Sequence, residues 1–200
     1  MTLEQFKAEL LLQTNDEGKR HFLNKYILHG TPFVFRDRED EYFEFRNLVA
    51  KKYSLHYQEV LIVGSGKLGF SYHKETEFTY ESDIDVAIVS NKLFERFFEI
   101  ICEYQYMLDK FRKIPTQTEL KMYSKFLMYL IKGWMRPDLL PVSFEIDILK
   151  DTWFSFFKSL SYGYSPIGNY KVTAGLFKSY SYLERYHLNG INDFYEKIKQ

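Results

Sequence analysis

Two stretches of the chain decide its fold: LIVGSGKLG at residues 61–69 and SDIDVAIV at residues 82–89. Each contains a short apolar run rich in β-branched residues, which is typical of a buried strand. Asp83 and Asp85 stand at positions i and i+2, so they share one face of the second strand, about 6.6 Å apart along the backbone. Two carboxylates at this spacing can hold a divalent cation together.

The glycines and the serine after the first strand belong to the same predicted site. A glycine-serine turn offers backbone N–H groups near the acidic end of the sheet, where a phosphate can bind. We therefore expect Gly64 and Ser65 to bind phosphate, and Lys67 of the same loop can reach it. Acids and loop together predict a site for a metal ion and a nucleotide phosphate.

Composition limits the function classes that fit the chain. The 200 residues carry 27 basic and 27 acidic side chains, so no net charge draws the protein to nucleic acid, and a long nucleic acid is not favoured as a partner. Aromatic residues make up 19% of the chain, more than a core requires, which leaves room for a protein partner. The single cysteine, Cys102, fits the reducing cytoplasm, and with no signal peptide or membrane-spanning segment in sight we expect a cytoplasmic protein without membrane contact.

The pattern of apolar residues predicts an α/β (α+β) fold in one unit. A helical N-terminal arm is expected over residues 1–55, an α/β core with a small mixed sheet over 56–150, and a helical C-terminal region over 151–200. The expected helices cover about residues 3–13, 16–29, 37–53, 90–111, 118–132, 151–160, 172–187 and 190–198.

A third acidic strand is expected over residues 142–149. Its sequence VSFEIDIL alternates between apolar and polar side chains, which puts Glu145 and Asp147 on one face. Nucleotidyl transfer needs the charge of a polyphosphate to be neutralised, and a few carboxylates from neighbouring strands can bind the Mg²⁺ ions that do this. Asp83, Asp85 and Asp147 suit that role.

These motifs resemble the polymerase-β-like nucleotidyltransferase superfamily over about residues 58–150. The resemblance implies that Gly64 and Ser65 hold the nucleoside triphosphate, that Asp83 and Asp85 bind metal, and that Asp147 assists the attacking hydroxyl, with Glu145 as the second candidate for this third acid. The chain departs from the family in a long segment between loop and acids, residues 71–81, and in Phe70, where a small polar residue is common.

The resemblance also suggests a further nucleotide contact. Lys178 falls in the helix expected over residues 172–187, where related enzymes often place a lysine that contacts the triphosphate. Mg²⁺, or Mn²⁺ in its place, is the implied cofactor, and a nucleoside triphosphate is the implied partner.

Other site types fit less well. GSGKLG at residues 64–69 satisfies the dinucleotide fingerprint, but the acids precede the apolar run and no helical periodicity follows the glycines. The phosphate-loop pattern fails at Phe70, and the five histidines lack zinc spacing.

The sequence thus predicts an enzyme that moves a nucleoside monophosphate to an acceptor hydroxyl and releases pyrophosphate. The acceptor, a protein, an RNA end, a nucleotide or a small molecule, is left open, and a toxin, antitoxin or phage-defence role rests on analogy. The alternative is a catalytically silent nucleotide-binding module that regulates a partner protein.

Overall fold

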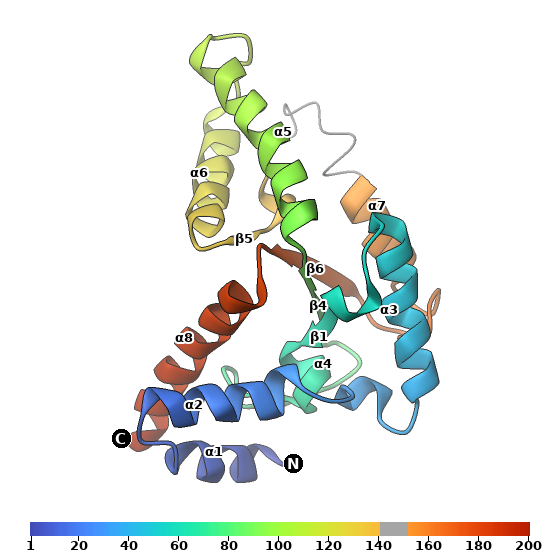
Figure 1. Cartoon of the computed structure of the whole chain (residues 1–200), viewed down its shortest axis with the longest axis vertical. Coiled ribbons are helices and arrows are strands. Elements are labelled where there is room, and N and C mark those ends of the chain that lie inside the picture. Colours follow the sequence, from blue (N-terminus) through green and yellow to red (C-terminus); the bar gives the residue numbers. More distant parts are fainter. Residues whose placement is uncertain (141–151) are drawn as a thin grey trace.

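The computed structural model describes residues 1–140 and 152–200, apart from the side chain of Asp138, and its centre is a four-stranded mixed sheet (Figure 1). The strands are β1 (Val60–Val63), β4 (Ile84–Val89), β6 (Val172–Phe177) and β5 (Trp134–Met135), in this spatial order. β4 pairs antiparallel with β1 and parallel with β6, and β5 lies antiparallel to β6. This small mixed sheet flanked by helices confirms the expected α+β fold.

The central strand β4 separates two apolar layers because its side chains alternate. Ile84, Val86 and Ile88 point to the larger core, whereas Ala87 and Val89 pack on the opposite face. Asp85 shares that opposite face, so the predicted metal ligand lies on the face with the smaller apolar cluster.

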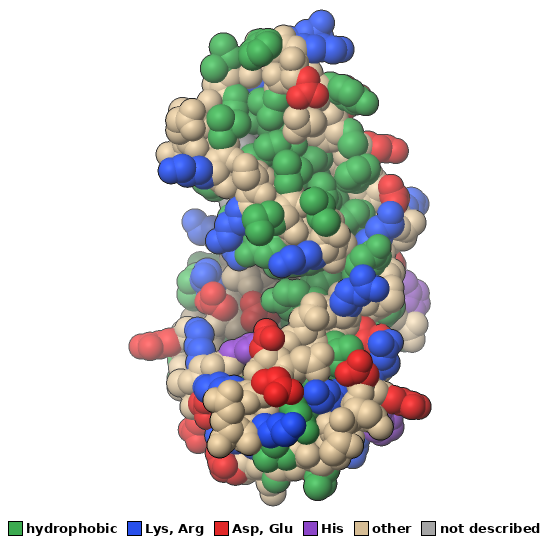
Figure 2. Space-filling model, turned by 90° about the vertical axis from the view of Figure 1, so that its left-hand side faces the viewer, with side chains coloured by type: hydrophobic (Ala, Val, Ile, Leu, Met, Phe, Trp, Pro, Cys, Tyr) green, Lys and Arg blue, Asp and Glu red, His purple; other side chains and the backbone are tan. Residues whose placement is uncertain are grey.

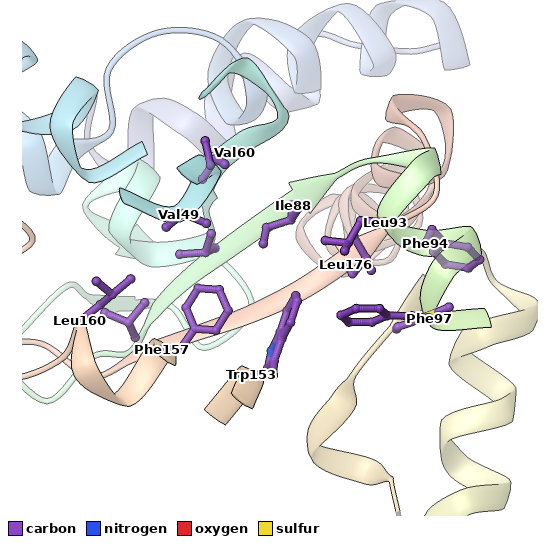
Figure 3. Close-up of a cluster of buried hydrophobic side chains, with 14 of the residues drawn as sticks. Val49, Val60, Ile88, Leu93, Phe94, Phe97, Trp153, Phe157, Leu160 and Leu176 are labelled. Carbon is purple, nitrogen blue, oxygen red and sulfur yellow. The ribbon is translucent and has the colours of Figure 1, made fainter. Parts of the chain in front are cut away.

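Three helices pack against the sheet in the larger core. They are α3 (Glu39–Tyr53), α5 (Asn91–Asp109) and α7 (Thr152–Ser159). Figure 3 shows Val49, Leu93 and Trp153 from these helices converging on Ile88 and Leu176 of the sheet. Ser90 caps α5 by accepting a hydrogen bond from the Leu93 backbone, which lets this helix begin directly after β4.

The opposite face is covered by α8 (Tyr180–Lys199), which inserts Leu183 against β4 and β6. The far half of α8 packs against α1 (Leu3–Leu11) and α2 (Asp16–Leu23), and a turn of π-helix, Asn24–Leu28, continues α2. A second aromatic core forms there around Phe6, Phe22, Phe70 and Phe194. The N-terminal arm is therefore helical, as predicted. Helix α8 contributes both to this aromatic core and to the smaller apolar cluster on the sheet.

α6 (Gln117–Ile131) returns beside α5 and leads into β5. The two helices extend away from the sheet (Figure 1), and hydrophobic side chains gather over this upper part in Figure 2, whereas charges of both signs cover the lower part. A hollow lies between the two parts at the left of Figure 2, with acidic side chains among those that line it.

Short elements connect the larger ones. They are the 3₁₀ turns Phe33–Phe35, Tyr57–Glu59 and Pro137–Leu139, the single-turn helix α4 (Gly64–Leu68) and the hairpin of β2 (Phe70–Ser71) with β3 (Thr76–Glu77). Within the described part of the chain, every helix is too short or too polar to cross a lipid bilayer.

Two predictions about the C-terminal region were wrong. Residues 172–177 form strand β6 and not the start of a helix, because the parallel pairing with β4 outweighs the helical spacing of the residues that follow. The helix expected over 190–198 is the continuation of α8, which passes through Gly190 without a break. The strand expected over residues 142–149 lies outside the described residues.

Candidate functional site

The glycine turn and the acidic strand meet at one end of the sheet. Val63 pairs with Asp85 across the antiparallel ladder, so the turn after β1 passes beside the Asp85 side chain. A Cβ atom on Gly64 would lie 2.7 Å from Oδ2 of Asp85, closer than such atoms approach, and Gly64 has a φ of +67°. Only glycine fits both the backbone conformation and this approach to the carboxylate.

Strand β6 adds two polar side chains that face the two acids. The parallel register sets Thr173 beside Asp85, and its hydroxyl donates a hydrogen bond of 3.0 Å to Oδ1 of Asp85. Two residues earlier, the Lys171 ammonium donates to Oδ2 of Asp83 at 2.9 Å. Because side chains alternate along a strand, Lys171 and Thr173 share the face of Asp83 and Asp85.

Opposing effects act on the pKa of the Asp85 carboxyl group. Its side chain reaches solvent but is walled in by protein on most sides, and the resulting loss of hydration raises the pKa of its carboxyl group. The hydrogen bond from Thr173 lowers this pKa, the Asp83 charge raises it, and the charges of Arg136 and Lys171 lower it. Two acids and two cations therefore act on one another across a small area.

Tyr186 of α8 is a further neighbour of this group. Burial is the main cause of its raised pKa, and the charge of Asp85 adds to it. Its ring also packs edge-on against Trp134 and Phe177. The helix that covers this sheet face thus brings a phenol near the acids.

The two acids fit a magnesium site that a ligand completes. Hydroxyl and ammonium groups each engage one oxygen of a carboxylate that has two. In residues 1–140 and 152–200, no third acid, histidine or cysteine joins them as a ready-made cluster. Mg²⁺ is commonly held by one or two carboxylates, with water and substrate phosphates as its other ligands, so this donor set suits it.

The third predicted acid cannot be placed. Asp147 and its alternative Glu145 both fall in the segment outside the described residues, and their assignment stays a prediction. In the described sheet, the strand beside β4 that faces the acid pair is β6, with Lys171 and Thr173.

Lys67 is buried, and its ammonium lies against the backbone of residues 29–31. Its ammonium donates to the backbone carbonyls of His29, Gly30 and Thr31, with a distance of 2.7 Å to Gly30. Burial lowers its pKa to about 8. A phosphate would have to compete with these carbonyls, so the structure favours a structural role. Lys67 ties the glycine loop to residues 29–31, of which Gly30 and Thr31 line a cavity of about 310 Å³ beside α3.

Lys178 lies at the opposite end of the sheet from the acids. It follows β6 directly, and its ammonium pairs with Glu95 of α5 at 2.8 Å. Since β4 and β6 run parallel over six residues, Lys178 is roughly 16 Å along the strands from Asp85 and farther from Asp83. Lys178 therefore lies apart from the two acids, and its contact with a triphosphate stays a prediction. The lysine beside the acids is Lys171, which directly precedes β6.

Ser65 keeps a position compatible with its predicted role. It is half-buried as the second residue of α4, and its carbonyl accepts the Gly69 N–H at 2.8 Å, which closes the glycine loop. Although α4 begins on the glycines, the antiparallel pairing of β1 with β4 excludes the parallel dinucleotide-binding fold that the GxGxxG pattern would otherwise allow.

Comparisons of the chain with protein-family models, curated proteins and solved structures found no match.

Proposed function

We propose that the protein is a metal-dependent nucleotidyltransferase. The observation that carries the proposal is the close approach of Gly64 to the Asp85 carboxylate, with Asp83 two residues before it. A phosphate-binding turn and a pair of metal-binding acids are of use together when the ligand carries both a polyphosphate and a divalent cation.

In the proposed reaction, the oxygen of an acceptor hydroxyl attacks the α-phosphorus of a nucleoside triphosphate. A bond from this oxygen to phosphorus forms and the hydroxyl proton is lost to solvent, while the bond from the α-phosphorus to the bridging oxygen breaks and pyrophosphate leaves. Mg²⁺ bound at the site would offset the negative charge of the phosphates. A cytoplasmic location, suggested by the lone Cys102, suits this substrate.

The residues of the chain have separate tasks in this proposal. Asp83 and Asp85 provide the metal ligands, and Thr173 orients the Asp85 carboxylate through its hydrogen bond. Gly64 lets the phosphate-binding turn pass directly beside the Asp85 carboxylate, where a Cβ atom would not fit. The ammonium of Lys171 and the guanidinium of Arg136 add positive charge at the same place.

A nucleotide-binding module without catalysis is the second candidate. It is favoured by the pairing of Asp83 with Lys171, because acids that are already balanced by cations can bind a ligand without transferring part of it. The two candidates differ in one outcome: only the enzyme releases pyrophosphate.

The test is the substitution Asp85→Asn, with Glu95→Gln as the matched control. Glu95 is likewise paired with a lysine, but at the far end of the sheet. With Mg²⁺, each of the four labelled triphosphates and cell extract as the acceptor source, we expect Asp85→Asn to lower pyrophosphate release by roughly 100-fold or more and Glu95→Gln to leave it unchanged. Unfolding curves should show both variants folded.

Two results would count against the enzyme. Undiminished release by a folded Asp85→Asn variant would overturn the metal assignment. Tight nucleotide binding by the wild type, with no pyrophosphate from any of the four triphosphates, would establish the binding module instead.

A further inference from the structure

Lys171 is held at its backbone and exposed at its side chain. Its carbonyl accepts the Ile84 N–H at 2.8 Å, and the next residue, Val172, opens β6 beside β4. The Lys171 side chain is 54% exposed and that of Asp83 is 44% exposed. An ion pair this open to water contributes little to stability, so the ammonium can leave Asp83 at small cost.

The charges around Asp83 and Asp85 give this ion pair a consequence for binding. Lys171 pairs with Asp83, and the positive charges of Arg136 and Lys171 lower the pKa of Asp85, so cations of the protein already act on both carboxylates. A divalent cation alone has to compete with Lys171 for Asp83. A cation that arrives with a polyphosphate does not, because the released ammonium gains the phosphate oxygens as new partners.

We infer that Lys171 is a positioning residue with two alternative partners, the Asp83 carboxylate and the phosphate chain of a bound nucleotide. This inference rests on the proposed function for the identity of the ligand. With these two partners, Lys171 makes the site selective. It weakens binding of a bare divalent cation and strengthens binding of the same cation together with a nucleoside triphosphate.

The test uses two binding measurements on Lys171→Met. Binding of Mn²⁺ alone, followed by the electron paramagnetic resonance signal of the free ion, should tighten by about two- to fivefold because the competing ammonium is gone. Binding of a non-hydrolysable triphosphate analogue with Mg²⁺, measured by calorimetry, should weaken by about tenfold because a charge-assisted contact is lost.

Two controls separate this exchange from a general change of charge. Lys171→Arg keeps the cation and should stay close to the wild type in both measurements. Lys178→Met removes a lysine of similar exposure, also paired with an acid, at the other end of the same strand, and should change neither affinity.

The test depends on Lys171→Met changing the two affinities in opposite directions. If Lys171→Met leaves both affinities unchanged, or moves them in the same direction, the inference is wrong. Neither measurement requires turnover, so a wild-type protein that shows both shifts but releases no pyrophosphate would disprove the transferase and keep the role of Lys171. A protein that transfers nucleotide but lacks the two shifts in affinity would support the transferase and disprove the role of Lys171.

Discussion

At the scale of single residues, the structure turns on how closely Gly64 approaches Asp85. The turn needs a positive φ and leaves no room for a Cβ atom, so two independent constraints fall on one residue. The sequence motif indicated glycine and acid separately. Their contact depends on the register of β1 with β4, in which Val63 stands opposite Asp85.

Gly64→Ala should separate these two constraints when it is compared with Gly163→Ala. Gly163 has a φ of +88° with no atom within 4 Å of an added Cβ, so its substitution reports the backbone cost alone, about 1 kcal/mol. We expect Gly64→Ala to cost about 2–3 kcal/mol and to weaken Mn²⁺ binding, because the new methyl group displaces the carboxylate of Asp85. Urea unfolding and the Mn²⁺ titration measure the two effects.

Equal losses of stability in the two variants, with unaltered Mn²⁺ binding, would mean that Asp85 moves aside freely. The close approach would then have no importance for the site.

At the scale of elements, β6 determines what faces the acids, and a buried serine determines where β6 begins. Ser161 follows α7, donates to the Phe157 carbonyl and accepts the Val172 N–H, both at 2.9 Å. This hydroxyl therefore ties the end of a helix to the first residue of the strand. The position of Lys171 depends on that tie, since it directly precedes Val172.

Ser161→Ala should loosen the start of β6. The Val172 N–H would be left without its partner in a buried place, which costs about 1–3 kcal/mol. Hydrogen exchange at Val172 should become faster, and urea unfolding should show the lost stability. Ser159→Ala is the control, because that exposed hydroxyl contacts only the Phe156 carbonyl. Protection of Val172 equal to that of the wild type would show that pairing with β4 alone fixes the strand.

Strand β6 also marks the limit of prediction from the sequence. The strands β1 and β4 and the helices α1, α2, α3, α5, α6 and α7 follow from local periodicity and caps, and the structure has them close to their predicted bounds. The single turn of helix α4 was not predicted, because its residues were expected to form a loop. β6 runs almost directly into the amphipathic helix α8, so the sequence pattern predicts one helix over both. Two features of the sequence could have separated the strand from the helix. Serine is common directly before a helix, and Ser179, with its extended backbone (φ −157°), stands directly before α8. The β-branched pair Val172 and Thr173 favours a strand.

The same reason accounts for the site residues that were missed. Thr173 and Lys171 each meet an acid 88 positions earlier in the chain. Such partners are set by strand order and register, and no spacing within either segment encodes them. Asp83, Asp85 and Gly64 could be found because each stands in a local motif.

At the scale of the whole molecule, α8 connects the two cores on its side of the sheet. Leu183 belongs to the cluster on the sheet, whereas Ile191 and Phe194 belong to the aromatic core with α1 and α2. His187 lies between them on the same helix. Its side chain is buried, and its Nε2 has no hydrogen-bond partner among the described residues.

Acid should destabilise the protein through His187. Burial, with a smaller contribution from the charge of the nearby His73, lowers its pKa to about 4. Between pH 6.5 and pH 4 the unfolded chain binds a proton that the folded chain does not, so stability falls as the pH falls, by roughly 3 kcal/mol in total. In His187→Leu this part of the pH dependence should vanish, whereas the exposed-site variant His21→Gln should retain it.

Urea unfolding at a series of pH values between 4 and 7 measures this difference. A wild type and a His187→Leu variant with parallel curves over that interval would show that the imidazole is charged in the folded protein.

The order of the strands has a last consequence, for behaviour at high concentration. The outer strands of the described sheet, β1 and β5, are only four and two residues long. A chain with zero net charge and 19% aromatic residues lacks the mutual repulsion that keeps proteins dispersed. Short outer strands offer few unpaired backbone groups to a neighbouring molecule, and so protect the chain from fibrillar association by geometry where charge does not.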